Sequence, residues 1–339
     1  MATPGQPLVY IGSYTPDTDG RGPGITVCVQ DPDTGELTPQ GEPLATPSPS
    51  YLAVHPHGRT LYAVNELEPH GTLGSFAIAM DGSLTPLGTV PTGGSSPCHV
   101  TVDPTGEYVI TANYGDGRVS VHPIGAHGAA ERVTSVVPLA GHGPIVDRQT
   151  GPHAHQVTFD GDILMVCDLG SDQVWRYRFI DGSAHPDAPM SAPPGFGPRH
   201  LVHTPRGTWL VGELEPAVLP LPDGTPVPIA TADTAERNYP SAIIAAPDTR
   251  HLYVANRGPD TITTFAVRGD TLEQIAENPC GGAWPRDAAI IGDFLYVAAQ
   301  QSDTVTALRR DRATGLLSAP VTALKTGSPT CVVAAIPTL

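Results

Sequence analysis

Short runs in which apolar and polar residues alternate recur along the whole chain, and a proline opens one run in every group. Alternation with a period of two predicts β-strands rather than helices. The opening prolines are Pro49, Pro97, Pro152, Pro198, Pro240, Pro285 and Pro329. They lie 48, 55, 46, 42, 45 and 44 positions apart. A repeat of roughly 40–50 residues with several strands per unit is typical of the blades of a β-propeller.

Each repeat has the same internal order. A first run meets a turn such as "HPHGR" or "DPTGE", in which proline and glycine set the backbone dihedral angles. A second run such as "LYAV" or "LYVA" follows, and then a third such as "TITTFAV" and a weaker fourth. No helical period of useful length is present. We therefore expect four strands in each repeat and an all-β fold.

The two ends of the chain complement one another. Only one run, "PTCVVAAI", follows the seventh proline, whereas the N-terminal segment supplies "LVYIGSY" and "GITVCVQ" before the first proline. Pairing between these runs would close the ring and hide sheet edges that would otherwise be unpaired. The sequence thus predicts one seven-bladed propeller domain over residues 1–339, closed by the C-terminal strand pairing with N-terminal strands. The proline-rich stretch "AVLPLPDGTPVPIATADTAERN" predicts that the fourth blade is the least regular.

Composition argues against several kinds of partner. The formal net charge of −16 disfavours binding of the whole surface to nucleic acid or to an anionic membrane. No apolar run approaches the ~18 residues of a membrane span, and no basic segment followed by an apolar one opens the chain. The five widely spaced cysteines suit a reducing compartment. We expect a cytoplasmic protein with no nucleic-acid or membrane partner.

The repeat also predicts where a functional site lies. The first and second strands of a blade are antiparallel, so the start of the first and the end of the second lie on the same rim of the propeller. The residues just after the opening prolines are Ser50, Cys98, His153, Arg199, Ser241, Arg286 and Thr330. Those just after the second runs are Tyr14, Glu66, Tyr114, Asp168, Glu213, Arg257 and Gln300. Ionisable residues of blades three to six should therefore meet on one rim.

Such a concentration of charge favours a ligand site, because buried charges are costly unless they are paired or bind a ligand. The structural alternative is a polar link between neighbouring blades, such as a Glu213–Arg257 bridge. A second alternative is a non-catalytic propeller that binds a ligand or a protein, for which the "LYVAN" run is equally suitable.

The stretch "GPHAHQV" places His153 and His155 two residues apart, and such residues share one face of a strand. The pair could be structural, could be half of a metal site or could be the reactive end of an active site. Several nearby arginines would oppose a cation, so no metal is expected. The role of general base is favoured, because imidazole titrates near neutrality.

Motifs throughout the chain resemble the lactonase family of seven-bladed propellers, which includes bacterial 6-phosphogluconolactonases of propeller type and the fungal carboxymuconate-lactonising enzyme. The similar stretches are "GSYT", "PSYLAVHP", "LYAVNE", "ANYGDGRV", "DRQTGPHAHQV", "CDLGSDQVWRY", "GPRHLV", "LYVANRGPDTI", "WPRDAAI" and "GSPTCV". The resemblance implies that a lactone ring is hydrolysed or formed without cofactor or metal. It implies catalytic roles for His155, Arg199, Glu213 and Arg257.

The leading expectation is hydrolysis of an anionic sugar-type lactone such as 6-phosphogluconolactone. The substrate-binding residues expected from the rim and from the resemblance are His153, Arg286, Glu66 and Asp168. A lactonising cycloisomerase or a biosynthetic cyclase acting on a carboxylate remains an alternative, because it would use the same groups. Ala242 and Gly212 stand where many bacterial members carry an acidic residue and an asparagine, and these departures concern the substrate more than the fold.

Overall fold

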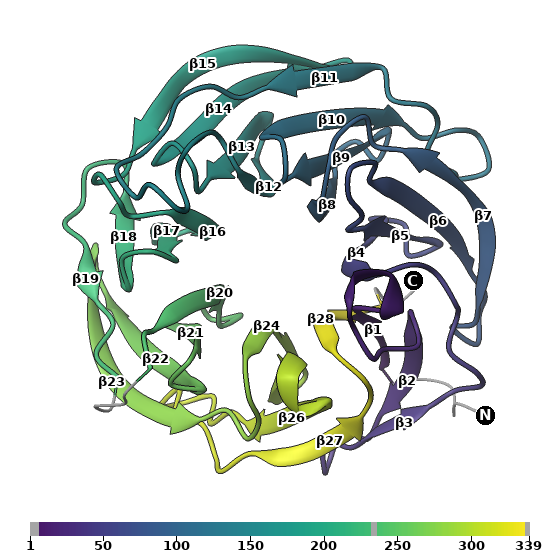
Figure 1. The fold of residues 1–339 in the computed structure, drawn as a ribbon. Coiled ribbons are helices and arrows are strands. Elements are labelled where there is room, and N and C mark those ends of the chain that lie inside the picture. The colour runs from purple at the N-terminus through teal and green to yellow at the C-terminus, as the bar shows by residue number, and fades with distance from the viewer. Residues whose placement is uncertain (1–6, 232–235, 336–339) are drawn as a thin grey trace.

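The computed structural model describes residues 7–231 and 236–335. These residues form seven four-stranded antiparallel sheets, arranged as blades around a central axis (Figure 1). The prediction of an all-β, seven-bladed propeller is confirmed. In the same part of the chain no helix is long and apolar enough to cross a membrane.

The first strand of each blade lies innermost (Figure 1). In chain order these are β4 (Pro49–Val54), β8 (Pro97–Val102), β12 (Ala154–Asp160), β16 (Pro198–Thr204), β20 (Tyr239–Ala245), β24 (Pro285–Ile291) and β28 (Pro329–Ala334). The second strands are β5 (Thr60–Asn65), β9 (Tyr108–Asn113), β13 (Ile163–Asp168), β17 (Gly207–Gly212), β21 (His251–Arg257), β25 (Phe294–Ala299) and β1 (Leu8–Ser13).

The outer strands complete each sheet. The third strands are β6 (Thr72–Ile78), β10 (Arg118–Pro123), β14 (Gln173–Ile180), β18 (Ala217–Leu221), β22 (Thr261–Arg268), β26 (Thr304–Arg309) and β2 (Thr26–Gln30). The fourth are β7 (Leu84–Pro91), β11 (Ser135–Pro138), β15 (Ser183–Ser191), β19 (Val227–Pro228), β23 (Thr271–Pro279), β27 (Val321–Lys325) and β3 (Leu37–Pro39). Two 3₁₀ turns, η1 (Pro16–Thr18) and η2 (Gln300–Ser302), lie between strands. The fourth blade has the short β19, as its proline-rich sequence indicated.

The ends of the chain meet in the seventh blade, whose sheet has the order β28-β1-β2-β3. Ile11 of β1 pairs with Val332 of β28, and Tyr10 pairs with Val333. The predicted closure of the ring is therefore confirmed. It gives β1 a partner on each side, so that the second strand of the seventh blade has no open edge.

The core lies between neighbouring blades. One buried cluster joins Val9 and Ile11 of the seventh blade to Tyr296 and Ala298 of the sixth. The tyrosines of the second strands add a polar contact across the same junctions. The hydroxyls of Tyr62, Tyr253, Tyr296 and Tyr10 donate to the carbonyls of Gly128, Gly315, Gly35 and Gly82 in the next blade. Each contact pairs the tyrosine hydroxyl while the ring fills the junction.

Candidate active site

Every first strand carries a register shift close to its start. In the third blade Ala154 pairs with Asp168 and Gln156 pairs with Cys167, which leaves His155 without a ladder partner. Arg199 is skipped in the same way between Pro198 and His200. Such a bulge bends the strand and redirects the side chain of the skipped residue. The residues skipped in other blades include Ser50, Cys98, Arg286 and Thr330.

Four of the skipped residues, Cys98, His155, Arg199 and Arg286, help to line a cavity at the top of the channel. It has a volume of about 210 Å³, and we call it the rim pocket. Its lining residues are Tyr14, Glu66, Cys98, Tyr114, Arg148, His155, Arg199, Glu213, Arg257 and Arg286. Four arginines face two glutamates, so the pocket is cationic although the chain as a whole carries a charge of −16. This local charge suits an anionic ligand.

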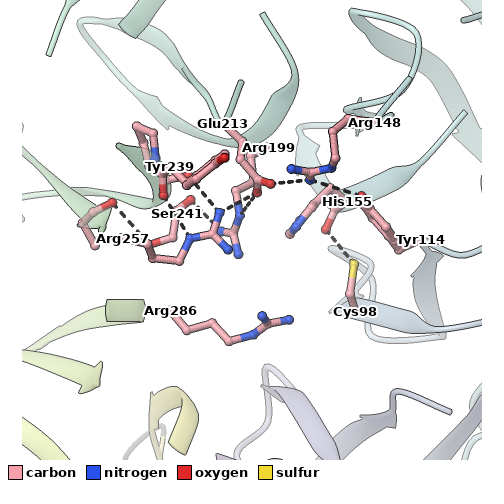
Figure 2. Close-up of polar contacts among 12 residues, drawn as sticks. Cys98, Tyr114, Arg148, His155, Arg199, Glu213, Tyr239, Ser241, Arg257 and Arg286 are labelled. Atoms are coloured by element: carbon pink, nitrogen blue, oxygen red, sulfur yellow. Dashed lines mark hydrogen bonds and ion pairs between the residues drawn. The ribbon is translucent and has the colours of Figure 1, made fainter. Parts of the chain in front are cut away.

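Glu213 is the centre of a buried ion cluster (Figure 2). Its Oε2 accepts from Nε of Arg199 at 2.9 Å and lies 2.7 Å from a terminal nitrogen of Arg257. Its Oε1 accepts from Arg148 at 2.6 Å. Burial alone would raise the pKa of this carboxyl, but the three arginines outweigh burial and hold the pKa far below its ordinary value. Glu213 is therefore a permanent anion that positions arginines rather than a group that exchanges protons.

Arg199 and Arg257 are also tied to backbone carbonyls. Arg199 donates to the carbonyl of Ser241 at 2.6 Å, and Arg257 donates to the carbonyl of Tyr239 at 2.9 Å. Arg257 additionally lies over the ring of Trp284, with 5.3 Å between the guanidinium carbon and the ring centroid. Burial and the neighbouring Arg257 lower the pKa of Arg199 to about 10, which leaves it charged at pH 7. These contacts fix the position and the orientation of both guanidinium groups, and both carry a positive charge.

Arg286 reaches into the pocket from the opposite side of the channel (Figure 2). Its guanidinium lies 4.7 Å from the centroid of the Tyr14 ring and 3.5 Å from Oε2 of Glu66. Burial would lower the pKa of Arg286, but Tyr14 and Glu66 outweigh it and raise the pKa. Compared with Arg199 and Arg257, it is held loosely, so its donors are more available for a ligand than theirs.

His155 lines the same pocket as these arginines and is 7% exposed. Burial lowers its pKa well below the ordinary value, and Arg199, Arg286 and Arg257 lower it further. The imidazole is therefore neutral at physiological pH. The Tyr114 ring packs edge-on against it with 5.6 Å between ring centroids, and Cys98 donates from its Sγ to the His155 carbonyl at 3.3 Å. A neutral imidazole in this place can accept a proton from a bound water.

The structure places His153 and Asp168 outside the rim pocket. His153 stacks on Tyr114 and bonds its carbonyl at 2.8 Å through Nδ1. Asp168 is fully buried and accepts from Ser171, from Trp175 and from the backbone N–H of His153. The expectation that the two histidines share one face is wrong, because β12 begins only at Ala154 and His155 occupies the bulge that follows.

The sequence-based site also missed a residue. Arg148 lies in the segment between β11 and β12, where it pairs with Glu213 and donates to the Tyr114 hydroxyl at 3.4 Å. Gln149 anchors this segment by donating to Asp172 at 2.8 Å. The only sequence signal was the motif "DRQTGPHAHQV", which contains Arg148 but gives no blade position for it.

The described residues contain no group of three or more histidine, cysteine, aspartate or glutamate side chains that could hold a metal ion. All five cysteines are free and buried. Burial raises the pKa of Cys98 far above its ordinary value, so this thiol in the pocket wall is a poor nucleophile.

Comparison with known proteins identifies the family of this propeller. The family model for the lactonase seven-bladed β-propeller matches residues 8–334. The chain belongs to this family. A Bacillus subtilis relative named 6-phosphogluconolactonase is 29% identical over 95% of this chain and 97% of its own length. The crystal structure of a Lactobacillus plantarum protein is 32% identical, with a TM-score of 0.89 over 97% of this chain and 99% of that one. The structure of a periplasmic gluconolactonase from Pseudomonas aeruginosa is 29% identical, with a TM-score of 0.87 over the same shares.

Proposed function

We propose that this lactonase-family protein hydrolyses an anionic sugar lactone in the rim pocket, with 6-phosphogluconolactone as the leading candidate. The observation that carries the proposal is that neutral His155 lines the same pocket as the fixed cations Arg199 and Arg257 and the loosely held Arg286. The name of the Bacillus subtilis relative supports the choice of substrate.

The anionic end of the substrate binds Arg286. A guanidinium presents a planar fork of donors that matches carboxylate or phosphate oxygens. Because the side chain is 18% exposed and lies beside the opening, a phosphate can reach it without leaving water completely. Arg148, of which 34% is exposed, is the second cation near the mouth of the pocket.

The lactone carbonyl then lies near His155. The imidazole takes a proton from water as that water attacks the carbonyl carbon, and the oxygen of the carbonyl becomes negative. Arg199 and Arg257 stabilise this charge from positions that Glu213 has fixed in advance. Preorganised donors of this kind contribute roughly 10²–10³ in rate. The protonated imidazole returns the proton to the ring oxygen as the ring opens.

The proposed step draws on water, one base and cationic donors, so it uses no cofactor. The experiment compares the purified protein with His155→Ala and Arg199→Ala on 6-phosphogluconolactone and on carboxymuconate. The proposal predicts that the wild type hydrolyses the lactone much faster than either variant. Turnover of carboxymuconate alone would instead favour the lactonising reaction, and equal rates for all three proteins on both compounds would rule out both reactions.

A further inference from the structure

A second, smaller cavity lies in the channel beneath the rim pocket. Its volume is about 10 Å³, which is close to the space that a single buried water occupies. We call it the lower chamber, and its lining residues are Ser50, Tyr51, Cys98, His155, Arg199, His200, Arg286, Asp287 and Thr330. Four of these residues, including His155, also line the rim pocket and so separate the two cavities.

Two side chains of the lower chamber have polar atoms without a protein partner. The hydroxyl of Ser50 and Nδ1 of His155 are buried and unpaired, and their residues are only 3% and 7% exposed. A buried polar atom that lacks a partner costs roughly 1–3 kcal/mol, and proteins usually satisfy such atoms with an ordered water. The chamber is therefore polar enough, as well as large enough, to hold one.

The same chamber holds a carboxyl group. Asp287 accepts the backbone N–H of Val332 at 3.3 Å, and its carboxylate has capacity for further donors. Burial raises the pKa of Asp287 to about 6, opposed by the backbone N–H groups of Val332 and Ala288 and by Arg199 and Arg286. The carboxylate is thus the major form at pH 7. Tyr51 and Cys331 are the other titratable groups that interact with it.

The other carboxyl groups that line the two described cavities are already paired with arginines. A catalytic histidine usually has its second ring nitrogen held by a hydrogen bond, which selects the tautomer. Both oxygens of Glu213 are engaged by arginines, and Glu66 pairs with Arg286. Among the described residues that line the two cavities, Asp287 is the carboxyl group that faces the lower chamber.

We propose that one water in the lower chamber joins Nδ1 of His155 to Ser50 and Asp287, which makes Asp287 a positioning residue for the base. Nδ1–H donates to this water, and the water donates to the Asp287 carboxylate. The lone pair of Nε2 is then left for the rim pocket. During hydrolysis one proton moves from the attacking water to Nε2 and from Nε2 to the departing ring oxygen, while the Nδ1 proton stays in place.

This role rests on the proposed function, but the water and the tautomer can be observed without substrate. The first experiment is ¹⁵N NMR of the histidine side chains, with the His155 signals assigned by their loss in His155→Gln. The wild type should show His155 as the Nδ1–H tautomer, and Asp287→Asn should shift it toward a mixture. The control is Asp293→Asn, the same change at a surface pair with Arg312 on the turn after β24. A wild-type His155 protonated on Nε2 would overturn the proposal.

The second experiment is kinetic. Asp287→Asn should lower kcat on 6-phosphogluconolactone by about 10-fold or more, as expected for a disturbed general base, while KM changes less than about twofold. Ser50→Ala, which removes only a hydroxyl, should have a smaller effect in the same direction and covers the case in which Asp287→Asn fails to fold. Unchanged kcat in both variants would contradict the positioning role. If the wild type has no lactonase activity, the proposed function fails, and the NMR result alone decides the positioning role.

Discussion

Arg199 and Glu213 form a buried ion pair at the centre of the rim pocket. Nε of Arg199 lies 2.9 Å from Oε2 of Glu213, and the two side chains are only 3% and 5% exposed. Arg148 and Arg257 share the same carboxylate. Since one anion holds three cations, we expect its charge to stabilise the fold as well as the geometry of the pocket.

Glu213→Gln therefore leaves three clustered arginines without their common anion. We expect the free energy of unfolding to fall by about 3–5 kcal/mol, the usual cost of removing one partner from a buried ion pair. Urea denaturation at pH 7 measures this change. Glu273→Gln is the matched control, because Glu273 pairs with Arg268 on the surface and 60% of its side chain is exposed. A loss no greater than that of the control would show that the cluster does not depend on the charge of Glu213.

Arg286→Gln tests the proposed site for the anionic end of the substrate. Removing a charge-assisted contact of about 1.5–3 kcal/mol should lower kcat/KM for 6-phosphogluconolactone by roughly 10- to 100-fold. The effect on uncharged gluconolactone should be much smaller, since that substrate has no group for this arginine. Arg268→Gln, a change at an exposed arginine, is the control. An equal loss on both lactones would place the phosphate elsewhere.

The buried histidines predict how stability depends on pH. Burial lowers the pKa of His99 to about 3, and burial with Arg199 lowers that of His200 well below its ordinary value. In the unfolded chain both titrate near 6.5. The unfolded state then binds more protons as the pH falls below about 6.5, so the native state loses stability by up to about 1.4 kcal/mol per pH unit for each group.

His99→Asn should therefore reduce the loss of stability between pH 6.5 and pH 4.5. Urea denaturation at a series of pH values measures the slope for the wild type and the variant. His185→Asn, at an exposed position on β15, should leave the slope as it is in the wild type. A variant slope that equals the wild-type slope would mean that His99 is protonated in the folded protein.

Because β28 closes the ring, substitution of a valine on it should cost much more stability than substitution of an exposed valine on β27. Val332 of β28 is 2% exposed and packs in the core between the sixth and seventh blades, whereas Val321 of β27 is 51% exposed. Val332→Asp buries a carboxyl group without a partner and should cost several kcal/mol or prevent folding. Val321→Asp should change the free energy of unfolding by less than about 0.5 kcal/mol. Thermal unfolding monitored by circular dichroism compares the two, and similar losses would argue against the importance of the closing strand.

The sequence predicted the seven blades and the rim because both follow from the repeat. It did not predict the bulges, which decide which side chain enters the channel. Asp168 occupies the place that Asn65 and Asn113 hold in other blades, since all three end a second strand and pair with the start of the first. Aligning the third blade on Asp168, rather than on Pro152, would have placed His155 in the rim set.

The repeat could not predict the position of Arg148, for a different reason. It belongs to the connection between β11 and β12, and its position depends on contacts with Glu213 and Tyr114 that come from other blades. The sequence indicated at most a bridge between Glu213 and one arginine, Arg257. The distances show that it holds three, which depends on packing that no local pattern expresses.

The most direct measurement of the central claim is the rate of 6-phosphogluconolactone hydrolysis at pH 7 above the rate in buffer. It is made for the wild type and for His155→Gln, after both have been shown to fold. The proposed mechanism predicts a kcat/KM for the wild type that exceeds that of the variant by roughly 10²–10⁴, the usual contribution of a general base. Equal rates for the two folded proteins would contradict it.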